Sequence, residues 1–221
     1  MPSASNRATE SSGIRAPKQQ RSQRSFDTVL DATLDLLAEK GYQGFALTEV
    51  SRRTGVSVGS IYTRVDGKDD LLRAAQARFQ ERLVEEHLEM TRAERWEGKP
   101  LAVLVPELVT EFAELLRRRG AVLSAFMQRG AVDESVAKVG KAGYHVARES
   151  FTTLVLSRRD EIRHPDPERA VGSCFTSIYG ALARAMALDV SAEAAEDSGS
   201  DLAELVEDLG AMALAFLRSD G

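Results

Sequence analysis

The stretch of sequence that decides the fold is residues 48–72, TEVSRRTGVSVGSIYTRVDGKDDLL. Thr48 stands where it can cap a short helix that runs to Thr54, and Gly55 follows as a break, because glycine readily takes the left-handed conformation of a helix C-terminus. Ser57 can then cap a second short helix. Two short helices joined by a turn that contains glycine are typical of a helix-turn-helix. The stretch therefore predicts this motif.

The two predicted short helices divide their residues between an interior and an exposed side. Val50, Val56 and Ile61 have the spacing that fills the small interior between the helices. In such a motif the first helix braces the second, whose N-terminal residues enter the major groove of DNA. The second helix is therefore expected to turn a sparsely charged set of residues toward solvent or DNA: Val58, Gly59, Ser60, Tyr62, Thr63 and Arg64.

Helical patterns continue on both sides of this motif. Upstream, apolar residues recur at helical spacing from Phe26, and Gly41 is placed to end that helix. Downstream, Asp66 and Asp69 resemble the capping box of a helix that runs to about Trp96. Later patterns predict helices over residues 101–119, 121–130, 133–159, 165–188 and 202–217, with a kink or a start at Pro106 and a loop over 191–200. No segment interrupts them with a strand pattern, so the sequence predicts an all-α protein of about nine helices.

We expect three regions along the chain. Residues 1–25 hold Ser, Gln and Arg with almost nothing to bury, which predicts a disordered basic arm. Residues 26–72 hold the helix-turn-helix domain and the start of a fourth helix, and residues 73–221 form a second helical domain. Arg21 and Arg24 of the arm are candidates for minor-groove contact with DNA, although a solubilising tail would have the same composition.

The average composition conceals a charge asymmetry. The 221 residues are 43% apolar, and the net charge of -5 with a pI near 5.4 argues on its own against a nucleic-acid partner. Residues 1–78, however, hold 12 Lys and Arg against 9 Asp and Glu, a charge of +3, while the remainder carries -8. Positive charge is thus concentrated where DNA is expected.

The chain holds no recognisable targeting, membrane or cofactor signal. Its single cysteine, Cys174, has no partner for a disulfide within the chain and suits a reducing cytoplasm. The N-terminus lacks the apolar segment of a secretory signal, and no apolar run approaches the roughly 18 residues that span a membrane. His87, His145 and His164 share no metal-ligand spacing. We therefore expect a cytoplasmic protein without a metal or cofactor.

The segment 48–72, with its Thr, Gly-Val-Ser, Gly, apolar-Tyr, Lys and Leu-Leu, resembles the signature of the TetR (tetracycline-repressor) family. This resemblance implies an all-α fold with an N-terminal helix-turn-helix DNA-binding domain and a C-terminal domain for ligand binding and dimerisation. It also implies a sequence-specific transcriptional regulator, expected to be a repressor that a small-molecule effector releases from a palindromic operator on double-stranded DNA.

Residue roles carry over by position. The resemblance implies phosphate contacts from Thr48, Ser60, Tyr62 and Lys68, with the Ser57 cap beside them, and base-edge contacts from Val58, Gly59 and Thr63. Hydroxyls and an ammonium can bond to phosphate oxygens, whereas a methyl group of Val58 or Thr63 can pack on a thymine methyl. Two positions depart from the family pattern, which usually has His or Tyr at Arg64 and Phe at Val65. Arg64 can clamp a phosphate or pair with a guanine.

Each of these residues also has a plainer interpretation. Thr48 and Ser57 can be helix caps only. Tyr62 can be a packing residue and Lys68 an ordinary surface charge. Residues 55–59, Gly-Val-Ser-Val-Gly, match the G-x-S-x-G string of a serine hydrolase, but that string follows a strand in hydrolases and lies between two predicted helices here. We therefore expect no enzyme. The alternatives are a helical ligand- or partner-binding protein without DNA regulation, and a serine hydrolase.

A helix-turn-helix on a short half-site usually works in pairs, because twofold symmetric proteins read palindromic DNA. We expect a homodimer through the last two long helices, where small residues allow close packing of helices, although the same residues can pack internally. These residues are Gly172, Ser173, Ser177, Gly180, Ala181, Ala185, Gly210, Ala211, Ala213 and Ala215.

The resemblance also implies a pocket for an unknown small-molecule effector among the middle helices. The candidate lining residues are Trp96, Phe112, Phe126, Met127, Tyr144, His145, Phe151, Phe175 and Tyr179. Aromatic residues and methionine at helical spacing are equally typical of a packed core. The chemistry of the ligand is therefore not predicted.

Overall fold

The computed structural model describes residues 18–186 and 198–220, and helices make up most of this part of the chain. The α-helices are α1 (Lys18–Gly44), α2 (Leu47–Thr54), α3 (Val58–Tyr62), α4 (Lys68–Met90), α5 (Leu101–Gly130), α6 (Glu134–Leu156), α7 (Pro167–Ala185) and α8 (Ser198–Leu217). Two short 3-10 helices, η1 (Ala93–Trp96) and η2 (Arg159–Glu161), follow α4 and α6. The predicted all-α class is confirmed, with eight α-helices in the described residues where the sequence predicted about nine.

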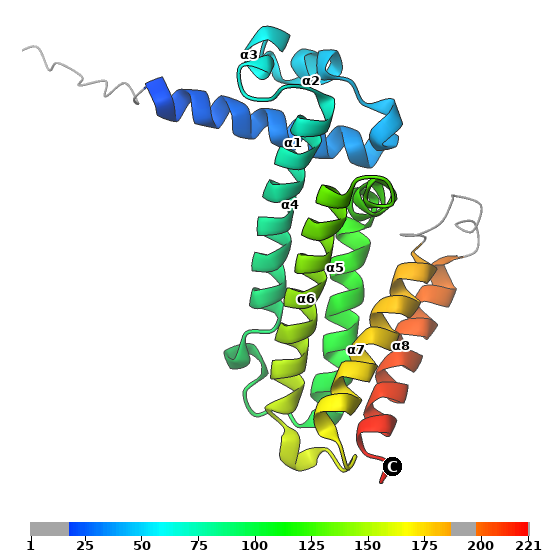
Figure 1. The fold of residues 1–221 in the computed structure, drawn as a ribbon. Helices are drawn as coiled ribbons and strands as arrows, with labels where there is room; N and C mark the ends of the chain where they lie inside the picture. The colour runs from blue at the N-terminus through cyan, green and yellow to red at the C-terminus, as the bar shows by residue number, and fades with distance from the viewer. Residues whose placement is uncertain (1–17, 187–197, 221) are drawn as a thin grey trace, which may run out of the picture.

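The helices are arranged along one long axis (Figure 1). α1 lies across one end, α2 and α3 pack above it, and these three helices form the N-terminal head. α4 leaves the head and descends beside α5 and α6, while α7 and α8 pair along the other side of the bundle. α4 is therefore the element that joins the head to the bundle.

The head is held together by a small apolar core. Val29 and Leu36 of α1, Val50 of α2 and Ile61 of α3 are each at most 1% exposed. Helices as short as α2 and α3 are not stable alone in water. Their positions therefore depend on this shared core.

The first helix is longer than the sequence predicted. α1 begins at Lys18, whereas the apolar pattern begins only at Phe26. The prediction of a disordered arm is therefore wrong for residues 18–25, and residues 1–17 lie outside the described part of the chain. Gln and Arg are good helix formers, and extending a helix from an anchored core is far easier than starting one. A polar extension of this kind leaves no periodic signal in the sequence.

The turns around α2 and α3 follow the sequence closely, with one exception. Gly41, with φ 64, ends the regular part of α1, and Gly55, with φ 71, ends α2, as predicted. Ser57 caps α3, also as predicted. Thr48 is not the cap of α2, because the helix begins at Leu47 and its N-cap is Ala46, two residues before Thr48.

The ends of α4 differ in detail from the predicted ones. Gly67 rather than Asp66 precedes the helix, and the N–H of Asp66 donates to Asp70 at 3.2 Å instead of to the residue three positions along. α4 ends at Met90, short of the predicted Trp96. Trp96 lies in η1, and its indole N–H donates to the carbonyl of Met90 at 2.8 Å.

α5 and α6 start within one residue of their predicted starts, whereas α7 starts at Pro167, two residues after its predicted start, and α8 starts at Ser198, four residues before it. Asp133 accepts hydrogen bonds from the first turn of α6, and Asp166 accepts the N–H of Arg169 at the start of α7, 3.1 Å away. The break predicted near Gly120 is absent, because Gly120 is buried inside a continuous α5 where packing outweighs its low helix propensity. Pro106 removes one backbone hydrogen bond in the second turn of α5 without ending the helix.

α6 and α7 end at Leu156 and Ala185, three residues before their predicted ends. Of the loop predicted over residues 191–200, only 198–200 are described, and they belong to α8. None of the described helices is long and apolar enough to cross a lipid bilayer.

Candidate nucleic-acid interface and internal cavity

The turn between α2 and α3 is fixed by backbone and hydroxyl hydrogen bonds. The N–H of Gly55 donates to the carbonyl of Ser51 at 2.9 Å, in a left-handed conformation that glycine adopts without steric cost. The Ser57 hydroxyl accepts the N–H of Ser60 at 3.1 Å and lies 2.8 Å from the Ser60 hydroxyl. Ile61 is buried beneath them. Together these contacts set the angle between the two helices.

Ser57 is the N-cap of α3 and does not have the surroundings of a nucleophile elbow. Both hydrogen-bond contacts of its hydroxyl belong to Ser60, and the described part of the chain has no strand to precede it. The Gly-Val-Ser-Val-Gly string therefore reflects the chemistry of a turn and a cap.

α3 presents an exposed and almost uncharged surface. Gly59, Ser60 and Thr63 are exposed, Tyr62 is 54% exposed, and Val58 is half-buried. Open space lies above Gly59, where an added Cβ would meet no atom within 4 Å. Small hydroxyls, a phenol and bare backbone are groups that can approach base edges and phosphates closely.

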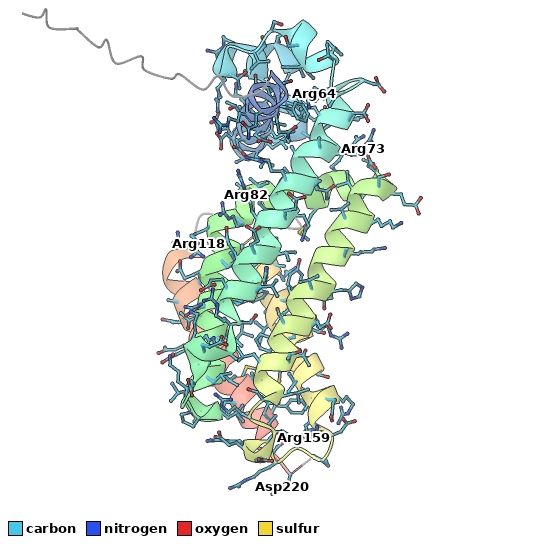
Figure 2. All side chains as sticks on the ribbon, turned by 90° about the vertical axis from the view of Figure 1, so that its left-hand side faces the viewer. Arg64, Arg73, Arg82, Arg118, Arg159 and Asp220 are labelled. Atoms are coloured by element: carbon cyan, nitrogen blue, oxygen red, sulfur yellow. The ribbon has the colours of Figure 1, made fainter. Side chains whose placement is uncertain are left out.

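Arg64 lies just after α3 and reaches toward α1. Figure 2 shows it beside α1, which that view presents end-on. Its Nη2 donates to the Ser22 hydroxyl at 2.6 Å, and its Nη1 donates to the amide oxygen of Gln23 at 3.5 Å. The guanidinium also lies 5.4 Å from the centroid of the Phe26 ring. Arg64 therefore connects the end of α3 to the polar extension of α1.

Lys68, the first residue of α4, packs against two aromatic rings. Its ammonium lies 4.4 Å from the ring centroid of Tyr42 and 4.6 Å from that of Phe45, and burial lowers its pKa. The two rings hold the ammonium in a fixed position at the N-terminus of α4, and the side chain remains half-exposed to solvent. Thr48 is exposed at the second position of α2.

Further basic residues belong to the same head. Arg24 is exposed on α1, and Arg21 lies in the same helix with its side chain outside the described set. Arg52 of α2, whose side chain is 75% exposed, was not predicted as a site residue. Arg52 has one loose ion pair, 3.6 Å to Glu49, whereas its neighbour Arg53 is held by two hydrogen bonds of 2.7 Å to Glu39. The two arginines differ only in the residues that they contact in the folded chain, so the sequence alone did not single out Arg52.

A charged cluster lies where the head meets the bundle, and we call it the Arg129 cluster: Tyr42, Asp69, Arg73, Arg129 and Asp133. The Tyr42 hydroxyl donates to Asp69, and this hydrogen bond together with burial raises the pKa of Tyr42. Arg129 lies 4.5 Å from the Tyr42 ring centroid and 3.3 Å from Asp69 Oδ1. Arg73 donates to Asp133 at 3.1 Å. The cluster thus joins α1, α4, α5 and the N-cap of α6.

A cavity of about 300 Å³ lies in the bundle close to this cluster, and we call it the α4–α6 cavity. Its wall is mostly apolar and is formed by α4, α5 and α6, with Tyr179 reaching it from α7. Gln76, also in the wall, donates to the carbonyl of Val136 at 2.9 Å and so joins α4 to the first turn of α6. A mostly apolar cavity with a few polar groups is typical of a small-molecule site.

The predicted pocket residues divide into two groups. Phe126, Met127, Tyr144 and Tyr179 line the α4–α6 cavity. The other five do not line this cavity: Trp96, Phe112, Phe151 and Phe175 are at most 2% exposed within the core, and His145 is exposed on α6. A cavity wall and a packed core have the same apolar residues at the same helical spacing, so the pattern could not separate them.

Three polar residues on the cavity side of α4 escaped prediction as a site: Gln76, Gln80 and His87. Their spacing places them along one side of the helix, facing an otherwise apolar wall. Gln76 is 2% exposed and His87 is 5% exposed. Polar residues at positions that a helix normally gives to its core were the signal that the sequence offered.

The small residues of α7 and α8 face two different ways. Gly172, Gly210 and Ala213 are buried within the chain, so they are wrong as interface residues. Gly210 packs so closely on Pro106 of α5 that an added Cβ would lie 3.0 Å from its Cα. Ser173, Ser177, Gly180, Ala211 and Ala215 are exposed, and so are the larger Met212 and Phe216.

Solved structures of other proteins share this fold over most of the chain. A TetR-family transcriptional regulator from Mesorhizobium loti MAFF303099 is 17% identical, with a TM-score of 0.73 over 89% of this chain and 96% of its own. GusR from Salmonella enterica is 21% identical, with a TM-score of 0.63 over 89% and 96%. A TetR transcription regulator from Haloarcula marismortui ATCC 43049 is 20% identical, with a TM-score of 0.63 over 88% and 97%. No curated protein matches the sequence significantly.

The head and its exposed α3 define a helix-turn-helix protein with a second, all-helical domain. The family model for bacterial regulatory proteins of the tetR family matches residues 29–75, which span most of α1, the whole motif and the start of α4. Residues 29–75 thus match the DNA-binding domain of the tetR family of bacterial regulatory proteins, and the described chain shares the overall fold of the TetR-family regulators above.

Proposed function

We propose that the protein is a homodimeric repressor that reads a palindromic operator with α3 and leaves it when a small molecule occupies the α4–α6 cavity. The observation that carries the proposal is the exposed surface of α3, which is capped by Ser57 and fixed from below by Ile61. A recognition helix needs such a rigid base, because base readout requires that side chains meet base edges at defined positions.

In this proposal the head divides its contacts between bases and phosphates. Val58, Gly59 and Thr63 face base edges, while the hydroxyls of Ser60 and Tyr62 bond to phosphate oxygens. Phosphate contacts also come from Thr48 and from the ammonium of Lys68, with the Ser57 cap beside them. Arg24, Arg21 and Arg52 add positive charge to the head. Because α3 itself carries almost no charge, affinity depends on these flanking groups and on dimerisation.

Dimerisation is assigned to the exposed sides of α7 and α8. Met212 is 66% exposed and Phe216 is 38% exposed, an unusual position for large apolar side chains unless another surface covers them. Ser173, Ser177 and Gly180 on α7 are small enough to let a partner helix approach closely. A twofold axis through this side would pair two heads for two half-sites.

Release by a ligand requires a contact between the cavity and the head. The Arg129 cluster supplies one, because Asp133 caps α6 while Arg73 and Asp69 belong to the first turns of α4. A ligand that favours a different position of α6 would act on α4 through these ion pairs. Such a ligand must bind the DNA-incompetent state more tightly, and the operator must weaken ligand binding by the same factor.

The test is selection of bound duplexes from a random DNA pool by the full-length protein. We expect a short palindrome to be enriched, and recovery of no enriched sequence at low salt would sink the proposal. Gly59→Phe is the variant to compare, because the open space above Gly59 lets the protein fold while the ring blocks approach to DNA. Ala77→Phe is its matched control, since Ala77 is exposed on α4 away from the motif. Only the first substitution should abolish enrichment.

A helical ligand-binding protein without DNA regulation is the second candidate, and the α4–α6 cavity is the observation that favours it. Under this alternative the wild-type protein and the Gly59→Phe variant would retain the same small fraction of random DNA, with no common sequence.

A further inference from the structure

We infer that the α4–α6 cavity binds an uncharged, elongated aromatic molecule that carries hydroxyl or carbonyl groups along one edge. The inference that such a ligand binds depends only on the cavity. The regulatory role of the ligand also depends on the proposed function. The argument depends on three features of the wall: a line of polar groups, the hydrogen-bonding capacity that these groups retain, and the distribution of charge.

The polar groups form a line along one helix. Gln76, Gln80 and His87 all project from α4 into the cavity wall, at intervals of four and seven residues. These intervals keep them on one side of the helix, and a rise of 1.5 Å per residue spreads them over about 16 Å. The remaining lining is mostly apolar, with Phe79 and Phe126 at a centroid distance of 5.7 Å, and its other polar side chains are Tyr144, Tyr179 and Lys141. A ligand that fits has one polar edge and aromatic or apolar faces.

His87 is held as a neutral acceptor. Its Nδ1 lies 2.7 Å from the carbonyl of Leu83, and only an N–H can pair with a carbonyl, so Nδ1 carries the proton. Burial lowers the pKa of His87, which keeps the ring uncharged at neutral pH. Nε2 is then an acceptor, and it has no hydrogen-bond partner within the described residues. A hydroxyl of the ligand is the group that satisfies it.

The two glutamines add unused groups in the same line. The side chain of Gln80 lies directly against Gly143 of α6, where an added Cβ would come within 1.8 Å of its Nε2. Neither end of this amide is hydrogen-bonded to the described part of the chain. Gln76 uses Nε2 for the carbonyl of Val136 and keeps its Oε1 for another donor. The line therefore offers both donors and acceptors, which suits carbonyl and hydroxyl groups together.

The wall offers no buried charge that could compensate an ionic ligand in the interior of the cavity. None of the described residues that line the cavity is Asp or Glu, so a cation would lose its water without gaining a counter-charge. Among the same residues Lys141 is basic but exposed, and neutral His87 cannot compensate an anion inside. The body of the ligand must therefore be uncharged.

The experiment measures binding to the full-length protein by isothermal titration calorimetry in the absence of DNA. The three probes are a dihydroxyflavone with one hydroxyl at each end, unsubstituted flavone, and the planar cation proflavine. We expect the dihydroxyflavone to bind about tenfold more tightly than flavone, because the latter leaves buried polar groups unpaired, and proflavine not to bind.

Two variants test whether the preference for the dihydroxyflavone over flavone depends on the polar side chains of α4. Gln80→Leu and His87→Phe should each reduce the advantage of the dihydroxyflavone over flavone severalfold, while Gln128→Leu should not. Gln128 is the matched control because it is an exposed glutamine of α5 that does not line the cavity. Gln80 is only half-buried, so its variant tests the inference even where His87→Phe fails to fold.

Three outcomes overturn the inference: no binding of the dihydroxyflavone, equal or tighter binding of proflavine, or an advantage over flavone that both Gln80→Leu and His87→Phe leave unchanged. These outcomes are separate from those of the DNA selection. A protein that enriches a palindrome but binds no flavone keeps the proposed repression and loses this ligand. A protein that binds the probe and enriches no DNA keeps the ligand site and loses the repressor.

Discussion

The guanidinium of Arg64 is shared among three residues of α1: the Ser22 hydroxyl, the Gln23 amide and the Phe26 ring. An arginine held in this way acts first within the protein, because it ties the polar extension of α1 to the end of α3. Two of its five N–H groups are already donated to Ser22 and Gln23, which fixes the direction of the guanidinium. We therefore assign Arg64 a positioning role at the interface with DNA.

Arg64→Ala should weaken binding to every sequence by about tenfold without changing base preference, because the extension of α1 loses its support. Fluorescence anisotropy on the selected operator and on each of its single-base variants measures both quantities. Ser22→Ala, which removes one of the partners, should show part of the same uniform loss. A change of preference at a single base pair would contradict this role and make Arg64 a reader of guanine.

Lys68 should contribute affinity for any DNA sequence, whereas Thr63 should contribute preference for one base pair. Lys68→Ala removes a positive charge held at the N-terminus of α4, so binding should weaken alike on all sequences and the salt slope should decrease by about one. Thr63→Ala should leave the salt slope unchanged and relax the preference at one base pair. Titrations at several salt concentrations provide the comparison, and equal losses on operator and random DNA for both variants would refute it.

Cys174 should be nearly inert in the folded protein. It is 6% exposed, and burial raises the pKa of its thiol to about 11. A raised pKa means less thiolate at any given pH, and thiolate is the reactive form. Near pH 8, iodoacetamide should modify the native protein about two orders of magnitude more slowly than the denaturant-unfolded protein, as followed by mass spectrometry. Equal rates would show that the packing between α7 and α8 opens readily.

At the scale of the element, the start of α6 combines local and tertiary bonding in one side chain. Asp133 accepts the N–H groups of Ser135 and Val136, at 3.0 and 3.3 Å, and also the guanidinium of Arg73. The first contacts fix where the helix begins, and the last ties that point to α4. The same side chain thus serves the fold and the contact between cavity and head.

Asp133→Ala should lower the Tm by several degrees, since both the cap and the ion pair are lost. Asp133→Asn should lower it less, because asparagine remains a good cap and loses only the charge. Circular dichroism during heating measures both values. Equal losses for the two variants would show that the ion pair, and not the cap, holds this end of α6.

At this scale the sequence predicted the turns and helix caps that depend on residues close by in the chain. Gly55 and Ser57 act on residues within four positions, so their roles could be deduced from spacing alone. The early start of α1 gave no apolar signal, and the wall of the cavity depends on contacts between distant residues such as Gln76 and Val136. For the residues proposed to contact DNA, the structure shows how exposed they are and which residues surround them. Their roles at DNA stay predictions.

At the scale of the whole molecule, the exposed sides of α7 and α8 should make the protein a dimer in solution. Met212→Glu should shift it toward the monomer, because a carboxylate would be buried against the partner copy. Val132→Glu is the control, since Val132 is 77% exposed in the α5–α6 connection. Size-exclusion chromatography with light scattering distinguishes the states. A dimer that survives the first substitution and not the second would place the interface elsewhere.

The head and the bundle follow one another along the long axis (Figure 1), and within the described part of the chain their charge differs: +2 over residues 18–78 against -4 over residues 79–186 and 198–220. Near a polyanion the head is therefore drawn inward while the more acidic part of the chain is repelled. A protein of this shape and charge therefore approaches DNA head first.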